Sequence, residues 1–184
     1  VKGCSSLKRF SIRDNCLSRL KVLDLGDCVG LEVISADEGC LGALENLSVS
    51  GCSSLKRFLM GDNCLNALTA FDASSSIREF VLGNTCCGSL RELRLTGCSD
   101  LMTFSGGEHS FGRLGLLDLT DASTLDSVQI SASISLRAVF LQGCTNLRDL
   151  DFLLNAKRLC FLSLGGCASL ERLPELSHLP TLRV

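Results

Sequence analysis

The chain has 184 residues, of which 46% are apolar and 21% are charged, and its formal net charge at pH 7 is −2. The apolar share is enough for a continuous core, and the small net charge gives no electrostatic basis for nucleic acid as the main partner. No apolar run approaches the roughly 18 residues that a membrane-spanning helix needs, so no membrane span is expected.

Cysteines recur at a nearly constant interval, beginning with Cys4, Cys28 and Cys52 at a spacing of 24 residues. Each lies in one frame, L-x-x-L-x-L-x-x-C-x-x-L, of which residues 20–31 are a clear copy. Self-similarity at this period predicts a solenoid, in which each unit buries its apolar face against its neighbours. The complete row comprises Cys4, Cys28, Cys52, Ser74, Cys98, Ala122, Cys144 and Cys167.

Each unit has a physical interpretation. The last two leucines of L-x-x-L-x-L alternate with other residues, which is the period of a strand with one buried face. The cysteine after the strand is expected to be a small buried hydrophobe whose thiol bonds a backbone carbonyl left unpaired by a turn. A returning segment buries two further side chains, such as Leu55 and Phe58, and polar stretches such as 105–110 close the unit as loops. Residues 150–158 are the best candidate for a short helix.

The predicted fold is therefore α/β: a leucine-rich-repeat solenoid, or horseshoe, with a parallel concave β-sheet and a mostly irregular convex side. The copy at 66–80 is degenerate, because Asn66 and Thr69 occupy its first two leucine positions, and a local irregularity is expected there. Residues 1–184 form a single repeat domain. Because both ends fall inside repeats, we interpret the chain as a fragment of a longer one.

Twelve cysteines raise three possibilities: buried reduced thiols, disulfides or metal ligands. A disulfide framework usually belongs to a short secreted chain with irregular spacing, and zinc favours C-x-x-C pairs, which are absent here. The regular rows favour buried, reduced thiols and hence a reducing compartment, the cytoplasm or the nucleus. A second row, four residues before the first leucine of a strand, comprises Cys16, Cys40, Cys64 and Cys86.

The sequence contains no catalytic signature. There is neither a G-x-x-x-x-G-K-[ST] phosphate loop nor a G-x-S-x-G nucleophile motif. The repeat assigns most cysteines to buried positions, where a thiol is inert. We therefore expect no enzyme activity, no cofactor and no metal site.

Three units carry a resemblance to a known family. They read LKVLDLGDCVGL at 20–31, LRELRLTGCSDL at 90–101 and LCFLSLGGCASLERLPEL at 159–176. These units resemble the repeats of plant intracellular nucleotide-binding, leucine-rich-repeat disease-resistance proteins, especially the class with a TIR domain. The resemblance implies a module that recognises a pathogen effector or a guarded host protein. It also implies that the module holds the parent's own nucleotide-binding domain inactive until recognition occurs.

A second family remains open, because cysteine-containing repeats also occur in the substrate-binding module of F-box ubiquitin-ligase adaptors. In either case the partner is a protein, and the contact surface is expected on the concave face, at the non-leucine positions of the strands. Apolar residues exposed on adjacent strands and rimmed by arginine are typical of protein interfaces. The predicted contact residues are Arg91, Glu92, Arg94, Leu116, Asp118, Arg137, Phe140 and Phe161.

Overall fold

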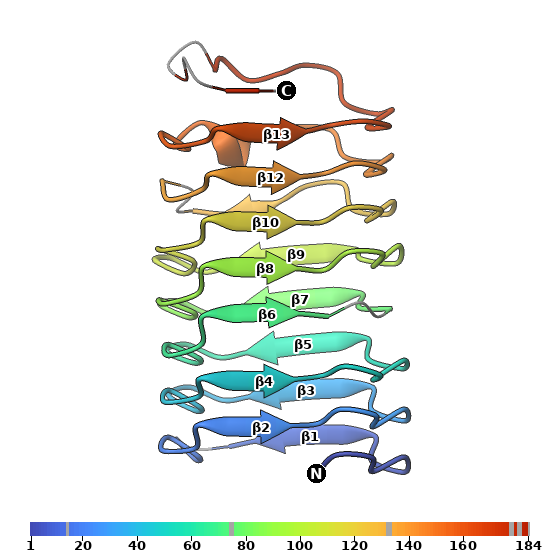
Figure 1. The fold of residues 1–184 in the computed structure, drawn as a ribbon, viewed down its shortest axis with the longest axis vertical. Helices are drawn as coiled ribbons and strands as arrows, with labels where there is room; N and C mark the ends of the chain where they lie inside the picture. Colours follow the sequence, from blue (N-terminus) through green and yellow to red (C-terminus); the bar gives the residue numbers. More distant parts are fainter. Residues whose placement is uncertain (14, 74–75, 132–133, 177–178, 180–181, 184) are drawn as a thin grey trace.

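The computed structural model is a parallel-strand β-solenoid, a column of stacked coils with a short strand on each of two opposite sides (Figure 1). It describes residues 1–13, 15–73, 76–131, 134–176, 179, 182 and 183. The predicted solenoid is confirmed in this form. Successive strands on one side pair in parallel at separations of 22 to 24 residues, as in Ala70↔Glu92 and Val22↔Asn46.

The side that faces the viewer in Figure 1, here called the front sheet, is built from the L-x-L segments. In β8, Leu93 is fully buried, whereas Glu92 is exposed and Arg94 is half-buried, as the alternating pattern predicts. The strands of this sheet are β2 (Val22–Asp24), β4 (Asn46–Ser48), β6 (Ala70–Asp72), β8 (Glu92–Arg94), β10 (Leu116–Asp118), β12 (Ala138–Phe140) and β13 (Phe161–Ser163).

The opposite side was expected to be mostly irregular, and that expectation is wrong, because six strands form a second parallel sheet there. Its residues also alternate between core and surface: Phe58 and Met60 are buried, while Arg57 and Leu59 between them are partly exposed. This short alternation gives each returning segment its own strand. The rear sheet comprises β1 (Arg9–Ile12), β3 (Val33–Ala36), β5 (Arg57–Met60), β7 (Glu79–Leu82), β9 (Thr103–Gly106) and β11 (Gln129–Ile130).

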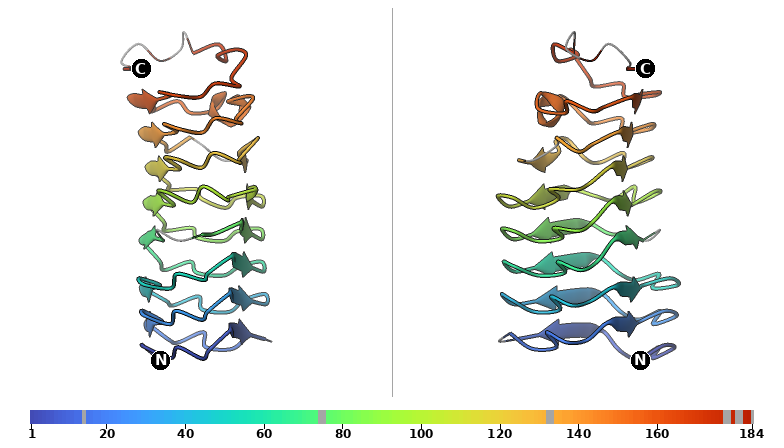
Figure 2. Two further views of the ribbon diagram at one scale, coloured as in Figure 1. Left: turned by 90° about the vertical axis from the view of Figure 1, so that its right-hand side faces the viewer. Right: turned by 60° about the vertical axis from the view of Figure 1, so that its left-hand side comes forward.

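The column is straight rather than curved (Figure 2). A horseshoe curves when one side holds helices, which pack about 8–10 Å apart, and the other holds strands, which lie about 4.8 Å apart. Here both sides advance by one strand spacing per coil. The front sheet is therefore not concave, and the described residues contain no α-helix that would support the α/β class. The short helix expected at 150–158 is present as a single 3₁₀ turn, η1 (Asp151–Leu153).

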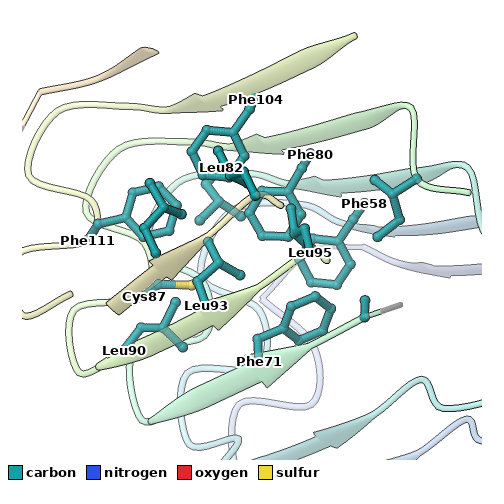
Figure 3. Packing of buried hydrophobic residues seen from close by; sticks show 14 of the residues in the cluster. Phe58, Phe71, Phe80, Leu82, Cys87, Leu90, Leu93, Leu95, Phe104 and Phe111 are labelled. Atoms are coloured by element: carbon teal, nitrogen blue, oxygen red, sulfur yellow. The ribbon is translucent and has the colours of Figure 1, made fainter. Parts of the chain in front are cut away.

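The interior between the two sheets holds a row of phenylalanines from successive coils (Figure 3). The rings of Phe58 and Phe80 are stacked with centroids 5.0 Å apart, and those of Phe80 and Phe104 are stacked at 5.6 Å. Phe71 approaches the same row from the front sheet, with its centroid 5.9 Å from that of Phe80. Phe80 is therefore surrounded by three aromatic neighbours and is 1% exposed.

Two cysteine rows line the turns of the column. In the first, the Sγ atoms of Cys52 and Cys144 donate to the carbonyls of Leu25 and Leu119 of the preceding coil, each at 3.1 Å. The residue before each of these cysteines, Gly51 or Gly143, has a left-handed φ that turns the chain inward. The predicted thiol–carbonyl bond is thus confirmed. It satisfies a buried carbonyl that would otherwise cost about 1–3 kcal/mol.

The second row makes the same contact at the other end of the coil. The Sγ atom of Cys64 donates to the Asp37 carbonyl at 3.1 Å, and that of Cys86 donates to the Gly61 carbonyl at 2.8 Å. Ser110 continues the row, because its fully buried hydroxyl donates to the Gly83 carbonyl at 2.6 Å. A hydroxyl and a thiol therefore serve the same purpose at equivalent positions.

The degenerate copy interrupts the front sheet. Strands β4 and β6 are not paired, so the sheet is divided into the two strands β2 and β4 and the five strands from β6 to β13. Figure 1 shows strand β5 of the rear sheet through this gap. The expected irregularity is therefore confirmed.

The register proposed for this copy is wrong, although Ser74 itself lies outside the described residues. Leu68, Phe71 and Ala73 fill the buried leucine positions, and Phe71 pairs with Leu93. Asn66 and Thr69 are partly or fully exposed. The reason is that the shortened repeat lies after β6, at 22 residues to β8, whereas β4 and β6 start 24 residues apart.

We expect Phe80→Ala to lower the free energy of unfolding by about 3–5 kcal/mol, because it leaves a cavity between three rings. Denaturant unfolding monitored by circular dichroism measures this change. Phe161→Ala is the matched control, since that ring is 40% exposed, and it should cost less than about 1 kcal/mol. Equal losses in the two variants would contradict the packing described here.

Thiol reactivity should follow the rows. Burial raises the pKa of Cys144 to about 12, which leaves almost no thiolate at pH 8, whereas Cys4, Cys16 and Cys160 are exposed. A disulfide reagent at pH 8 should therefore modify these three thiols rapidly in the folded protein, and the buried ones only after denaturation. Mass spectrometry of the labelled peptides identifies the sites. Rapid native labelling of Cys52 or Cys144 would show that the rows are accessible.

Candidate functional site

The predicted contact residues lie together on the front sheet, over strands β8 to β13. Cross-strand pairing aligns Glu92, Leu116, Ala138 and Phe161 in one row, because each pairs with the next. The same pairing aligns Arg94, Asp118, Phe140 and Ser163 in a second, parallel row. Residues spread over about 70 positions of sequence are thereby placed on one face, at the spacing of about 4.8 Å that the sheet imposes.

The apolar part of this face centres on two aromatic rings. The centroids of Phe140 and Phe161 are 5.0 Å apart with an interplanar angle of 39°. Phe161 is 40% exposed, and Phe140, Leu116 and Ala138 are half-buried. These side chains point away from the core, so their exposure is not needed for the packing of the column.

Charged groups on the same strands are partly neutralised by each other. The Arg94 guanidinium lies 2.6 Å from a carboxylate oxygen of Glu92 two residues earlier on β8. Asp118 accepts a hydrogen bond from the backbone N–H of Thr120 at 3.0 Å. Of the predicted contact residues, this leaves Arg91 and Arg137 as cations without an ion pair in the described part of the chain.

A hollow of about 500 Å³ opens where β8, β10 and β12 begin. It collects the four arginines Arg91, Arg113, Arg137 and Arg158, and none of them has an ion pair among the described residues. The remaining lining residues are Glu92, Gly115, Leu116, Ser135 and Ala138.

Sequence reasoning named Arg91 and Arg137 but missed Arg113, Ser135 and Arg158. All of them flank the first leucine of a repeat: Arg113 and Arg158 precede Leu114 and Leu159, and Arg91 follows Leu90. A signal was therefore present, because positions next to a buried strand-starting leucine face outward in every coil. It was overlooked because the frame directs attention to the residues between the leucines.

The front sheet near the N-terminal end presents a different surface. Lys21, at the position equivalent to Arg91, forms an ion pair with Glu45 of the next coil at 3.0 Å. Val22 is exposed and Asn46 replaces an apolar residue at the next position on the face. Charge neutralisation and the lack of an aromatic pair distinguish these strands from β8 to β13.

The buried thiols do not form a reactive centre. Burial raises the pKa of Cys87 to about 12, and it also raises the pKa of Cys52. The pKa of Cys86 is lowered, chiefly by a hydrogen bond from the Cys64 thiol, but its side chain is fully enclosed. A thiolate without access to solvent or substrate is not a nucleophile.

Metal and membrane features were searched for over the same residues. The described residues contain no group of three or more His, Cys, Asp or Glu side chains placed to hold a metal ion. Within them, no helix has the length and apolar character needed to cross a bilayer.

In comparisons with known proteins, no family model, no curated protein and no solved structure matches this chain.

Proposed function

We propose that this chain is the protein-interaction module of an intracellular plant immune receptor, working in the cytoplasm or the nucleus. Its front sheet over β8 to β13 binds a pathogen effector or a guarded host protein. The same surface contributes to autoinhibition by contacting the parent's own nucleotide-binding domain. The observation that carries the proposal is the exposed Phe140–Phe161 pair on a rigid, flat sheet.

The chemistry of this face supports protein binding. Aromatic and arginine side chains are the usual energetic anchors of protein interfaces, and here both occur within a few strands. The two rings offer apolar area that solvent covers in the free chain, and Arg91 and Arg137 lie at its edge. Because backbone hydrogen bonds fix each strand, little conformational entropy is lost when a partner binds.

The choice of an immune receptor depends on the repeat units. The units at 20–31, 90–101 and 159–176 share the C-x-x-L spacing of that family. The structure supports one requirement of such a role, because core and surface positions alternate strictly in the front strands. Outward residues can therefore change to suit a partner while the buried leucines keep the column intact.

The contact surface is tested by Phe140→Ala combined with Phe161→Ala in the full-length protein that contains this chain. If either ring is a hot spot, binding of the effector or host protein should weaken by about 1–2 kcal/mol or more. Thermal stability should change little, because both rings lie outside the core. The matched control is Val22→Ala with Met102→Ala, which truncates two exposed apolar residues elsewhere. Unchanged binding and defence signalling in a folded double variant would exclude this face.

The receptor assignment is tested by the complete coding sequence. It should encode a P-loop nucleotide-binding domain, preceded by a TIR domain, upstream of these repeats. An F-box in that place would instead assign the chain to a ubiquitin-ligase adaptor and contradict the proposal.

A further inference from the structure

We propose that the arginine-lined hollow at the start of β8, β10 and β12 is a binding site for a small molecule that carries two phosphoryl groups. Four guanidiniums converge there from four successive coils, and no carboxylate among the described residues pairs with them. The site lies beside the proposed protein-binding face, but Phe140 and Phe161 do not line it.

The backbone fixes the positions of the arginines. The Arg91 carbonyl accepts hydrogen bonds from the N–H groups of Gly115 and Leu116, at 2.8 and 2.9 Å. The Gly115 carbonyl in turn accepts from the Arg137 N–H at 2.8 Å. Arg91, Gly115 and Arg137 therefore stack in one row, with the two arginines about 10 Å apart across two coils.

A second row alternates with the first. Arg113, Ser135 and Arg158 each precede the first leucine of their coil, so a small residue again separates two arginines. Because the rows are displaced by one coil, every coil from Arg91 to Arg158 supplies one guanidinium. Gly115 and Ser135 leave open the space that a larger side chain would fill, and Leu116 and Ala138 line it with apolar surface.

The charge of the hollow selects the ligand class. Glu92 also lines it, but its carboxylate already pairs with Arg94, so four positive charges remain without an internal partner. A phosphoryl group carries about −1.5 to −2 charges at pH 7, so two such groups match four arginines. Arginine forks bind phosphate oxygens in a bidentate manner, which favours this ligand over a simple point charge.

The size of the hollow agrees with a small molecule. A volume of about 500 Å³ lies in the range of about 300–1,000 Å³ that is typical of small-molecule sites. The equivalent position near the N-terminal end contrasts with it, because Glu45 stands where Gly115 stands and pairs with Lys21. One carboxylate at this position therefore neutralises the row, and its replacement by glycine leaves the arginines available.

The test is isothermal titration of the 184-residue protein with inorganic pyrophosphate at low ionic strength. We expect one site per chain, with an affinity that falls as salt rises. Arg91→Gln with Arg137→Gln should weaken binding by about tenfold or more, since two of four charge-assisted contacts are lost. Arg9→Gln with Arg57→Gln removes the same charge from β1 and β5 of the rear sheet and should leave binding unchanged.

A second variant tests the hollow without removing an arginine. Gly115→Glu places a carboxylate between Arg91 and Arg137, and the nearest atom to an added Cβ is the Arg91 carbonyl oxygen at 3.5 Å, an ordinary contact. Binding should be lost while the melting temperature is kept. The proposal is overturned if pyrophosphate does not bind the wild-type protein, if the rear-sheet control weakens binding equally, or if Gly115→Glu binds normally. Equal affinity for a hexaglutamate peptide would assign the hollow to an acidic protein segment instead.

Discussion

Hydrogen bonding between successive coils is the constraint from which the rest of this structure follows. On both sides of the column each strand pairs in parallel with the strand one coil away, so both sides advance by the same distance of about 4.8 Å. Equal advance gives a straight column and a flat front sheet. It also places equivalent residues of successive repeats directly beside each other, which produces rows: phenylalanines inside, thiols at the turns and arginines outside.

The turns are where this arrangement is hardest to satisfy. Each coil must reverse twice, which leaves buried carbonyls without a partner and requires left-handed backbone at several residues that are not glycine. Leu41, Leu65 and Phe111 adopt such φ values, each at a cost of about 1–2 kcal/mol. All three are fully buried, so the apolar surface they remove from water offsets that cost. Cysteine suits the neighbouring positions because its thiol is small enough for the core and still bonds the carbonyl.

The same architecture explains how one face acquires different chemistry along its length. The buried residues are nearly constant from coil to coil, whereas the outward ones are free to vary. Near the N-terminal end, Lys21 and Glu45 neutralise each other across adjacent coils. Over β8 to β13, the glycine at 115 and the serine at 135 separate arginines that would otherwise have neighbours of opposite charge. A protein-binding face and an anion site can therefore lie side by side without any change in the core.

The repeat period by itself determined the stacked architecture, the strands at L-x-L, the buried thiols with their carbonyl bonds and the irregularity near residues 66–80. These features depend on local periodicity and on burial, which the sequence records directly. Only the tertiary structure decided that the returning segments pair into a second sheet, because four-residue strands such as Arg57–Met60 gain their hydrogen bonds from the next coil. It also decided the register of the degenerate copy, since a 22-residue spacing does not reveal on which side of β6 the chain is shorter. The convergence of Arg113 and Arg158 with Arg91 and Arg137 likewise depends on stacking, which brings together residues that the sequence separates by a full repeat.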